Sequence, residues 1–439
     1  MRHQAVVWAV LTAGLFSAPP SDAIGATLRV PAEYQTINAA LDASASGDTV
    51  LVAPGTYTDS EVRGSGFTHR SCAFMVDGVL LRSEAGPDVT VIDMQNAPGP
   101  QASVVECEGL PSETTAIEGF TLTGAPEGGT GAWVVGVGRM SFRNCIFRDL
   151  DAGASTGGGL AGNGDVDVID CEFVNCLATS GGGLIHSGGH LNLIGTSFRG
   201  CGNKGAYLLG VAGGVGESAL IEDCVFLDNW SDNAAGGLHI SQYNLGAVVR
   251  RCRFEGNQAY GSGPGGLAWG NFGPKLVEDC LFLNNAVSGD NGQGGGLATG
   301  GNGSCEVRGN TFYGNSQTYA FFGGASAFLG SGTIFEGNLV VGSQGNTAIE
   351  GDVVSGCNVF WDNPEGIGIP LSATDREIDP LFCDLENHDF TVRENSPCVE
   401  PGSLGCGQIG AFGAGCGIVS VDPSSWSRIK SSYRNGERP

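Results

Sequence analysis

Short segments in which apolar and polar residues alternate recur along the middle of the chain. Each segment ends in a phenylalanine, and these residues are Phe147, Phe173, Phe198, Phe226, Phe254, Phe282 and Phe312. Successive members of the series are 26, 25, 28, 28, 28 and 30 residues apart. Alternation predicts strands, and self-similarity at a fixed period predicts a repeat protein in which each unit packs on its neighbours.

A second phrase lies out of phase with the phenylalanines and places two or three glycines before a small apolar residue. Its apolar members are Leu160, Leu184, Val215, Leu238, Leu267, Leu297 and Ala325. The units lack the helical period of leucine-rich and tetratricopeptide repeats, and they are shorter than the ~40 residues of a propeller blade. We therefore predict an all-β solenoid, a parallel β-helix, with the seven phenylalanines stacked in one interior column.

The segment from Ile221 to Phe226 predicts a corner between two strands. Strict alternation would place Glu222 in the interior with Cys224 and Phe226, whereas a bend at Asp223 turns Glu222 outward. The residues equivalent to Asp223 are Asn144, Asp170, Gly195, Arg251, Asp279 and Gly309. All except Arg251 are residue types that tolerate the left-handed conformation. The outward positions beside the corner then form a ladder of alternating charge, which stacks favourably: Glu222, Arg250, Glu278 and Arg308.

Residues 1–23 have the pattern of a secretory signal peptide. Arg2 and His3 precede an apolar run from Ala5 to Phe16, and small residues before position 24 predict cleavage after Ala23. The run is too short to span a bilayer comfortably, and no later stretch approaches ~18 apolar residues. We expect a secreted or cell-surface protein without a transmembrane span after cleavage.

The composition narrows the classes of partner. A formal net charge of −25 argues against nucleic acid and anionic membranes, and it disfavours a polyanionic substrate such as pectate unless cations intervene. The 75 glycines predict many tight turns, and the 15 cysteines fit an oxidising compartment. No Cys/His cluster has zinc spacing, and calcium has no supporting motif, so we expect no cofactor. We also expect a monomer.

The sequence from Thr27 to Asp59 resembles the N-terminal cap and first coil of the pectin-lyase-like superfamily. The resemblance rests on an amphipathic segment with Ile37, Ala40 and Leu41 on one face, followed by Gly47-Asp48-Thr49-Val50-Leu51-Val52 and Pro54-Gly55-Thr56-Tyr57. The resemblance implies a right-handed parallel β-helix with a short N-terminal capping helix. The expected organisation is a signal peptide (1–23), a β-helix (24–416) with a cap (27–59), regular coils (about 70–345) and irregular terminal coils (346–416) that cap the C-terminal edge, and a tail (417–439).

The repeats are also similar to those of the polymorphic outer-membrane proteins, which are surface-exposed β-helices. The likeness rests on Phe226-x-x-Asn229, Phe254-x-x-Asn257, Phe282-x-x-Asn285 and Phe312-x-x-Asn315. Because only about 23 residues follow Cys416, we expect no counterpart of that family's C-terminal membrane barrel. The tail carries Trp426, Ile429 and Tyr433 on one face of a possible helix and is either a frayed end or an attachment signal.

Candidate catalytic residues are few. The Asn-Thr-Asp, Asp-Asp and Gly-His-Gly motifs of polygalacturonases are absent. Asp223, Arg251 and Asp279 could stack as acid, base and acid on successive coils, although the corner itself explains the two aspartates. His186 and His190 form a weak metal pair without a third ligand. The leading interpretation is a non-enzymatic protein that presents a repetitive surface to a glycan or envelope partner, and the alternative is a polysaccharide lyase or glycoside hydrolase with a non-standard site.

Two further expectations concern the repeat surface and the thiols. Trp230, Tyr243, Tyr260 and Trp269 could offer exposed aromatic rings to a partner or could simply cover core edges. Cys176 and Cys201 occupy equivalent positions on neighbouring coils, where stacking brings Cα atoms to about 4.8 Å, inside the range of a disulfide. We predict a Cys176–Cys201 bridge and a reduced interior column that contains Cys224, Cys252 and Cys280.

Overall fold

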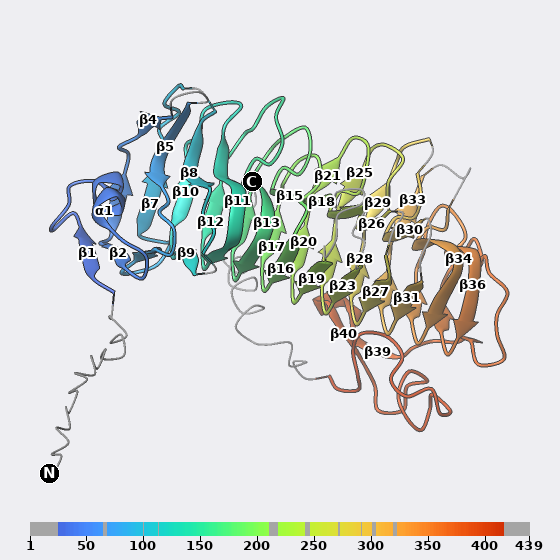
Figure 1. The fold of residues 1–439 in the computed structure, drawn as a ribbon. Coiled ribbons are helices and arrows are strands. Elements are labelled where there is room, and N and C mark those ends of the chain that lie inside the picture. Colours follow the sequence, from blue (N-terminus) through green and yellow to red (C-terminus); the bar gives the residue numbers. More distant parts are fainter. Residues whose placement is uncertain are drawn as a thin grey trace, which may run out of the picture.

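A computed structural model describes residues 25–416 except 65–67, 100, 113, 210–217, 242–245, 271–272, 291, 301–303 and 319–322. The predicted signal peptide and tail, together with Val215 and Tyr243, lie outside the described residues. The chain forms a long parallel β-helix whose coils follow one another along one axis (Figure 1). No helix in the described part of the chain is long and apolar enough to cross a membrane.

The coils build two long sheets, one short sheet and one small terminal sheet. Sheet A contains β1 (Thr27–Val30), β2 (Thr49–Val52), β4 (Glu61–Arg63), β5 (His69–Phe74), β6 (Leu80–Ser83), β8 (Ser103–Glu108), β9 (Thr115–Glu118), β11 (Thr130–Arg143), β13 (Leu160–Ile169), β15 (Leu184–Ser187), β16 (His190–Ile194), β18 (Ala206–Leu209), β19 (Ser218–Glu222), β22 (Leu238–Ser241), β23 (Ala247–Arg250), β26 (Leu267–Trp269), β27 (Lys275–Glu278), β30 (Leu297–Thr299), β31 (Cys305–Arg308), β34 (Ala327–Glu336) and β36 (Ile349–Gly356). Sheet B contains β3 (Gly55–Tyr57), β7 (Thr90–Asp93), β10 (Thr121–Thr123), β12 (Ile146–Arg148), β14 (Glu172–Val174), β17 (Ser197–Arg199), β20 (Val225–Leu227), β24 (Arg253–Glu255), β28 (Leu281–Leu283), β32 (Thr311–Tyr313), β35 (Leu339–Val341), β37 (Val359–Trp361) and β38 (Arg376–Glu377). Sheet C contains β21 (Trp230–Ser231), β25 (Gln258–Ala259), β29 (Ala286–Val287) and β33 (Ser316–Gln317), and the terminal pair is β39 (Phe382–Asp384) and β40 (Asp389–Val392), which are joined by the short 3-10 helix Leu385–Asn387.

The predicted phenylalanine column is confirmed. Within sheet B each phenylalanine is the register partner of the next, from Phe147 with Phe173 to Phe282 with Phe312. Their ring centroids lie 4.5–5.1 Å apart with nearly parallel planes, and all seven side chains are fully buried. The column is a continuous apolar core that ties each coil to the next.

The predicted corner is also confirmed at every position. Asp223 and its six equivalents have φ between 49° and 61°, and the series includes Arg251 at 51°. A second left-handed corner, which the sequence analysis did not identify, follows each short strand of sheet B. Its members have φ between 53° and 65° and are Asp149, Asn175, Gly200, Asp228, Gly256, Asn284 and Gly314. In every unit four residues separate the two corners, so the chain turns sharply on both sides of the phenylalanine.

The residue after each corner points into the core, and the asparagines at these positions form hydrogen-bonded ladders with their equivalents. In the second column Asn229, Asn257, Asn285 and Asn315 are fully buried, and each amide group bonds to the next at about 3 Å. Cys176 and Cys201 occupy the same column in the earlier coils. Their thiols donate to the carbonyls of Phe147 and Phe173 at 3.5 and 3.6 Å, as Asn229 Nδ2 does to Phe198 at 3.0 Å. Cysteine and asparagine therefore perform the same structural role.

The predicted Cys176–Cys201 bridge is wrong in this structure, because both residues are free buried thiols. Parallel coils in register keep equivalent Cβ atoms about 4.8 Å apart, whereas a disulfide needs about 3.8 Å. The predicted reduced column of Cys224, Cys252 and Cys280 is confirmed. The two disulfides in the described residues lie instead in the C-terminal region and join Cys357 to Cys406 and Cys383 to Cys416.

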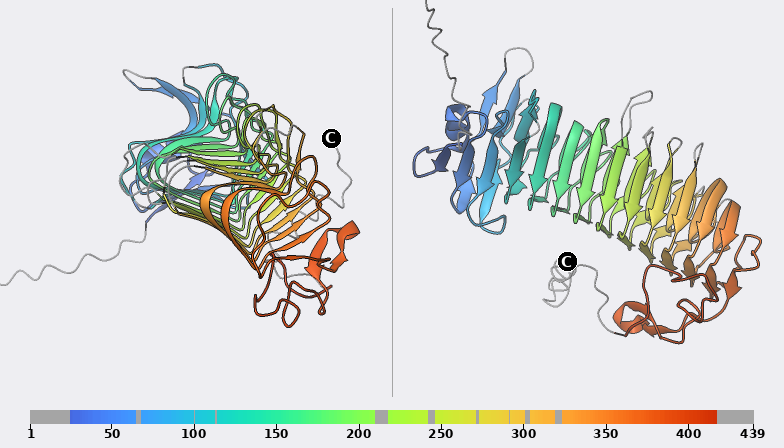
Figure 2. Two further views of the ribbon diagram at one scale, coloured as in Figure 1. Left: turned by 90° about the vertical axis from the view of Figure 1, so that its right-hand side faces the viewer. Right: turned by 60° about the horizontal axis from the view of Figure 1, so that its bottom comes forward.

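The two ends of the solenoid are covered differently. Thr36 caps the N-terminus of helix α1 (Ile37–Ala43), because its side chain accepts a hydrogen bond from the backbone amide of Ala39. The helix buries Ile37, Ala40 and Leu41 as predicted. At the other end, residues 366–369 add one more ladder segment, since Ala348 and Ile349 donate to Gly366 and Ile367. Residues 378–416 do not cap this edge as predicted but fold back beside the last coils (Figure 2).

The returning segment is held on the outer face of sheet B by apolar contacts. Phe390 packs against Leu281 and Leu283, and Val392 belongs to a cluster with Leu339 and Val359. These outward-facing residues of sheet B are apolar because the segment covers them. The segment therefore forms a wall beside the solenoid, joined to the last coils by the Cys357–Cys406 disulfide.

Candidate functional site

The structure stacks the three predicted catalytic candidates on successive coils, each at a left-handed corner. Arg251 Nε lies 2.9 Å from Asp223 Oδ1, and Arg251 Nη2 lies 3.0 Å from Asp223 Oδ2. Arg251 also forms an ion pair with Glu222. Because the Nε and Nη2 atoms of its guanidinium group are paired with the carboxylates of Asp223 and Glu222, Arg251 is held as part of a charged ladder. This arrangement does not present it as a free base.

Asp279 differs from Asp223 in its surroundings. Burial raises the pKa of Asp279 above its usual range, the neighbouring Glu278 carboxylate raises it further, and Arg251 acts in the opposite direction. The same Asp279 lines an open pocket between the solenoid and the returning C-terminal segment. Of the three candidates, only Asp279 is among the residues that line this pocket.

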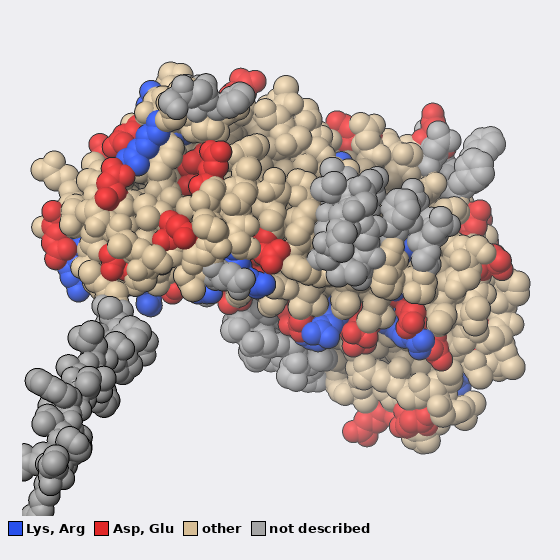
Figure 3. Space-filling model, in the orientation of Figure 1, with Lys and Arg blue, Asp and Glu red and all other residues tan. Residues whose placement is uncertain are grey.

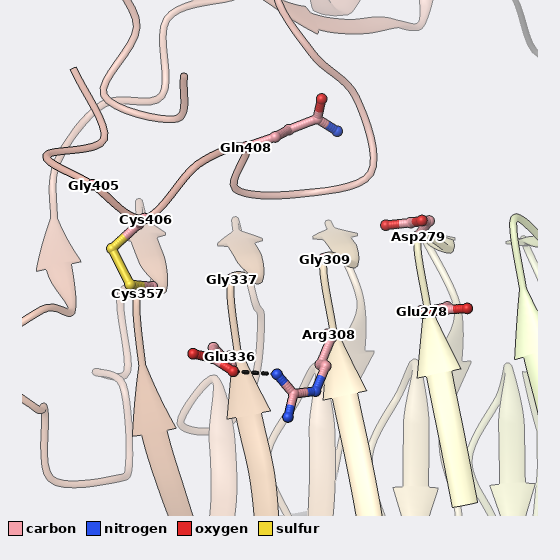
Figure 4. Close-up of a pocket in the computed structure, with 10 residues that line it drawn as sticks. All are labelled: Glu278, Asp279, Arg308, Gly309, Glu336, Gly337, Cys357, Gly405, Cys406 and Gln408. Atoms are coloured by element: carbon pink, nitrogen blue, oxygen red, sulfur yellow. Dashed lines mark hydrogen bonds and ion pairs between the residues drawn. A yellow bond between two sulfur atoms is a disulfide. The ribbon is translucent and has the colours of Figure 1, made fainter. Parts of the chain in front are cut away.

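The pocket has a volume of about 350 Å³ (Figure 4). It is lined by Glu278, Asp279, Arg308, Gly309, Glu336, Gly337, Cys357, Gly405, Cys406 and Gln408, and we call it the carboxylate pocket. The solenoid contributes the first seven residues from the ends of successive strands of sheet A, and the disulfide-linked returning segment contributes the last three. No local pattern in the sequence indicates this pocket, because its two walls are separated by 48 to 130 residues in the chain.

Polar groups of both charges face the carboxylate pocket. Arg308 forms ion pairs with Glu306 at 2.8 Å and with Glu336, and the Gln408 amide donates to the Gly410 carbonyl at 3.1 Å. The lining thus holds three carboxylates but one guanidinium group. The pocket belongs to the same outward ladder that the sequence predicts, which continues in register from Glu222 through Arg250, Glu278 and Arg308 to Glu336.

Charge on the surrounding surface is mixed rather than of one sign. Figure 3 shows basic and acidic atoms close together along the lower edge of the solenoid, below the strands of the middle and last coils. Within the outward ladder, Arg250 Nη2 lies 2.9 Å from Glu222 Oε2. Ladders of exposed ion pairs contribute only about 0–1 kcal/mol per pair, so their main effect here is to fix the register.

A second cluster of titratable residues lies near the N-terminal end. His69 Nδ1 is 3.5 Å from Glu106 Oε2, and His69 Nε2 is 3.9 Å from Glu108 Oε2. The pKa of Glu106 is raised to about 7, chiefly by burial and to a lesser degree by the Glu108 carboxylate, whereas a hydrogen bond from Ser103 at 2.8 Å lowers it. Sequence analysis missed this cluster. The available signal was a glutamate inside the apolar run Val104-Val105-Glu106-Cys107.

The other sequence candidates are kept apart or buried. His186 is fully buried and its Nε2 bonds to the Gly164 carbonyl at 2.8 Å, whereas His190 alternates outward and bonds to Ser218. The two imidazoles therefore lie on opposite faces of the coil. Among the aromatic candidates, Trp269 is buried, Trp230 is half-buried and Tyr260 is exposed, so they do not form one exposed face.

Comparison with known proteins identifies the architecture. The family model described as "Right handed beta helix region" matches residues 109–263 and 184–358, which together cover more than half of the chain. A search of curated proteins finds no match. Among solved structures, the A-module of the mannuronan C-5 epimerase of Azotobacter vinelandii is similar at 16% identity, covering 76% of this chain and 95% of that chain, with a TM-score of 0.33. At that TM-score the similarity supports no functional conclusion.

Proposed function

Because the chain belongs to the right-handed β-helix family, we propose that it is an exported, non-enzymatic binding protein that uses its solenoid side wall to hold a glycan. The observation that carries the proposal is the carboxylate pocket, where Asp279, Glu336 and Gln408 face one open volume. A glycan of the cell envelope or of another cell fits this description. The disulfides of the C-terminal region are compatible with an extracellular location.

The chemistry of the pocket suits sugar hydroxyl groups. Carboxylates accept hydrogen bonds from hydroxyls, and the amide and guanidinium groups donate to hydroxyl and ring oxygens. A volume of about 350 Å³ is at the lower end of the range for small-ligand sites, so we expect one or two sugar units to enter. The open side of the pocket leaves room for the rest of a chain.

Charge decides which glycans are favoured. Three carboxylates against one guanidinium group, in a protein of net charge −25, repel uronate and sulfated polymers. A neutral or amino-bearing glycan avoids this repulsion, and the ammonium group of an amino sugar is attracted by the carboxylates. We therefore infer a preference for neutral or amino sugars over acidic ones.

The test is a glycan array probed with the purified chain, followed by affinity measurements on the glycans that bind. We expect Asp279→Asn to weaken binding at least tenfold without loss of fold, because asparagine tolerates the left-handed corner, as Asn144 does at an equivalent position. Glu394→Gln, at an exposed carboxylate outside the pocket, is the matched control. Unchanged binding by Asp279→Asn would show that the pocket is not the binding site.

A polysaccharide lyase or glycoside hydrolase is the second candidate, and one observation favours it. Asp279 has a raised pKa and lines the pocket beside Glu278, and paired carboxylates in different environments are typical of general acid and base roles. Pectate and polygalacturonate remain poor substrates on charge grounds unless cations intervene, and the absent polygalacturonase motifs argue against them with or without calcium. Release of reducing ends or unsaturated products from neutral polysaccharides would support the enzyme.

A further inference from the structure

The cluster of His69, Glu106 and Glu108 lies far along the solenoid from the carboxylate pocket, on β5 and β8 near the N-terminal cap (Figure 1). The two strands pair in parallel, with Ser71 opposite Ser103 and Phe74 opposite Glu106. The imidazole of His69 lies between the two carboxylates, 3.5 Å from Glu106 and 3.9 Å from Glu108. One donor atom from each residue lies within 4.8 Å of the other two.

Two buried polar atoms in this cluster have no hydrogen-bond partner. Glu106 is 4% exposed, and its Oε1 is unpartnered, as is Nδ1 of His69. A buried carboxylate oxygen without a hydrogen bond is costly, on the order of a few kcal/mol. The cluster therefore contains two potential metal-ligand atoms that form no hydrogen bond within the protein.

Apart from the imidazole of His69, the described residues place no basic side chain in an ion pair with the two glutamates. No lysine or arginine within the described ranges forms an ion pair with Glu106 or Glu108, and the neighbouring Arg70 directs its Nη1 to Ser60 instead. No other group of three histidine, cysteine or carboxylate ligands comes together in the part of the chain that the structure describes. A dication would give the unused carboxylate oxygen a partner and would balance both carboxylates without requiring a proton on His69.

We propose that His69, Glu106 and Glu108 bind a divalent transition-metal ion, and that zinc is the ion their donor set fits best. Zinc binds imidazole nitrogen and carboxylate oxygen at about 2.0–2.2 Å, which places tetrahedral donors roughly 3.4 Å apart. The contact between His69 Nδ1 and Glu106 Oε2 already has this separation. The side chain of Glu108 is 58% exposed, so it is free to move the remaining distance.

The donor set discriminates among metals. Calcium prefers six to eight oxygen ligands and does not favour an imidazole, whereas zinc, iron and related ions accept one nitrogen and two carboxylates. Three protein ligands leave a fourth tetrahedral position open to water or a ligand, as in catalytic rather than structural zinc sites. Ser103 donates to Glu106 Oε2 at 2.8 Å, the oxygen that also faces His69, and would thereby fix the orientation of the buried carboxylate.

Isothermal titration calorimetry of the purified chain without a histidine tag tests the site, with zinc, manganese and calcium chlorides as the probes. We expect one zinc ion per chain at neutral pH, weaker manganese binding and no calcium binding. Glu108→Gln removes one ligand at an exposed position where the fold is not at risk, and we expect it to raise the zinc Kd at least tenfold. Glu106→Gln and His69→Gln should weaken zinc binding further, and circular dichroism checks that both variants fold.

Controls separate this site from incidental binding and from the proposed glycan function. Glu394→Gln removes an exposed carboxylate elsewhere and should leave zinc binding unchanged. Cobalt should give a visible absorption band for the parent chain that is lost in Glu108→Gln. Absence of zinc binding, or an equal zinc Kd in the parent and Glu108→Gln, would overturn the proposal, whereas Asp279→Asn should have no effect on zinc.

Discussion

The buried asparagine ladder predicts a large and position-specific loss of stability when Asn257 is replaced by alanine. Asn257 is fully buried, and its Nδ2 donates to the Phe226 carbonyl and to Asn285 Oδ1, each at 2.9 Å. Its Oδ1 accepts from the backbone and side-chain amides of Asn229 at 3.1 and 3.0 Å. One side chain therefore joins three successive coils.

The magnitude follows from the groups left without partners. Alanine removes all four hydrogen bonds and leaves the Asn229 backbone amide and the Phe226 carbonyl without this side chain as a partner. At about 1–3 kcal/mol for each orphaned buried group, we expect Asn257→Ala to lower the free energy of unfolding by roughly 3–5 kcal/mol. Asn257→Cys should lower the free energy of unfolding by about half as much, because Cys201 already occupies this column and donates to the Phe173 carbonyl at 3.6 Å.

Guanidinium unfolding followed by circular dichroism measures these differences through the transition midpoint. Asn233→Ala, at an exposed loop position, is the control and should stay within about 0.5 kcal/mol of the parent. The reasoning is refuted if Asn257→Ala costs less than about 1 kcal/mol, or if the cysteine and alanine variants are equally unstable. Either result would mean that the ladder does not connect the coils energetically.

Two other predictions concern protonation and disulfides. Burial lowers the pKa of His186 from 6.5 to about 4, so the unfolded chain binds more protons than the folded chain between these values, and stability falls as the pH drops through this range. From pH 7.5 to 5 this residue lowers the free energy of unfolding by about 2 kcal/mol. His186→Gln should remove this part of the pH dependence, as measured by denaturant titrations. Mass mapping of the non-reduced protein should find Cys357 joined to Cys406 and Cys383 to Cys416, with Cys176 and Cys201 free, and a Cys176–Cys201 peptide would contradict the register of the coils. Cys406→Ser should lower stability by up to about 4 kcal/mol on the chain-entropy model, measured by thermal unfolding.

The fold was largely predictable because each coil of a solenoid repeats the same short sequence pattern. The spacing of Phe226 and its equivalents specified one coil per repeat, and the Asn, Asp and Gly residues equivalent to Asp223 specified the corner. Arg251 adopts the same conformation without that local preference, because stacking on its neighbours fixes the backbone. The second corner was missed, although Asp228 and Asn284 carry the same left-handed signal.

The candidate sites were less predictable because they depend on contacts between distant segments. The carboxylate pocket needs Gln408 to return to Asp279, and no periodicity encodes that contact. The second cluster arises because neighbouring strands bring together His69 and Glu106, which are 37 positions apart in the chain. The Cys176–Cys201 prediction failed for a different reason, since Cα spacing alone ignores the parallel directions of the Cβ atoms.

The most direct test of the proposed function measures binding and turnover together, on one set of neutral, amino-bearing and uronate polysaccharides. The account predicts retention of neutral or amino-bearing glycans, loss of that retention in Asp279→Asn, and neither new reducing ends nor unsaturated products. Product formation by the parent chain that disappears in Asp279→Asn or Arg251→Ala would contradict it and would make the protein a polysaccharide-cleaving enzyme.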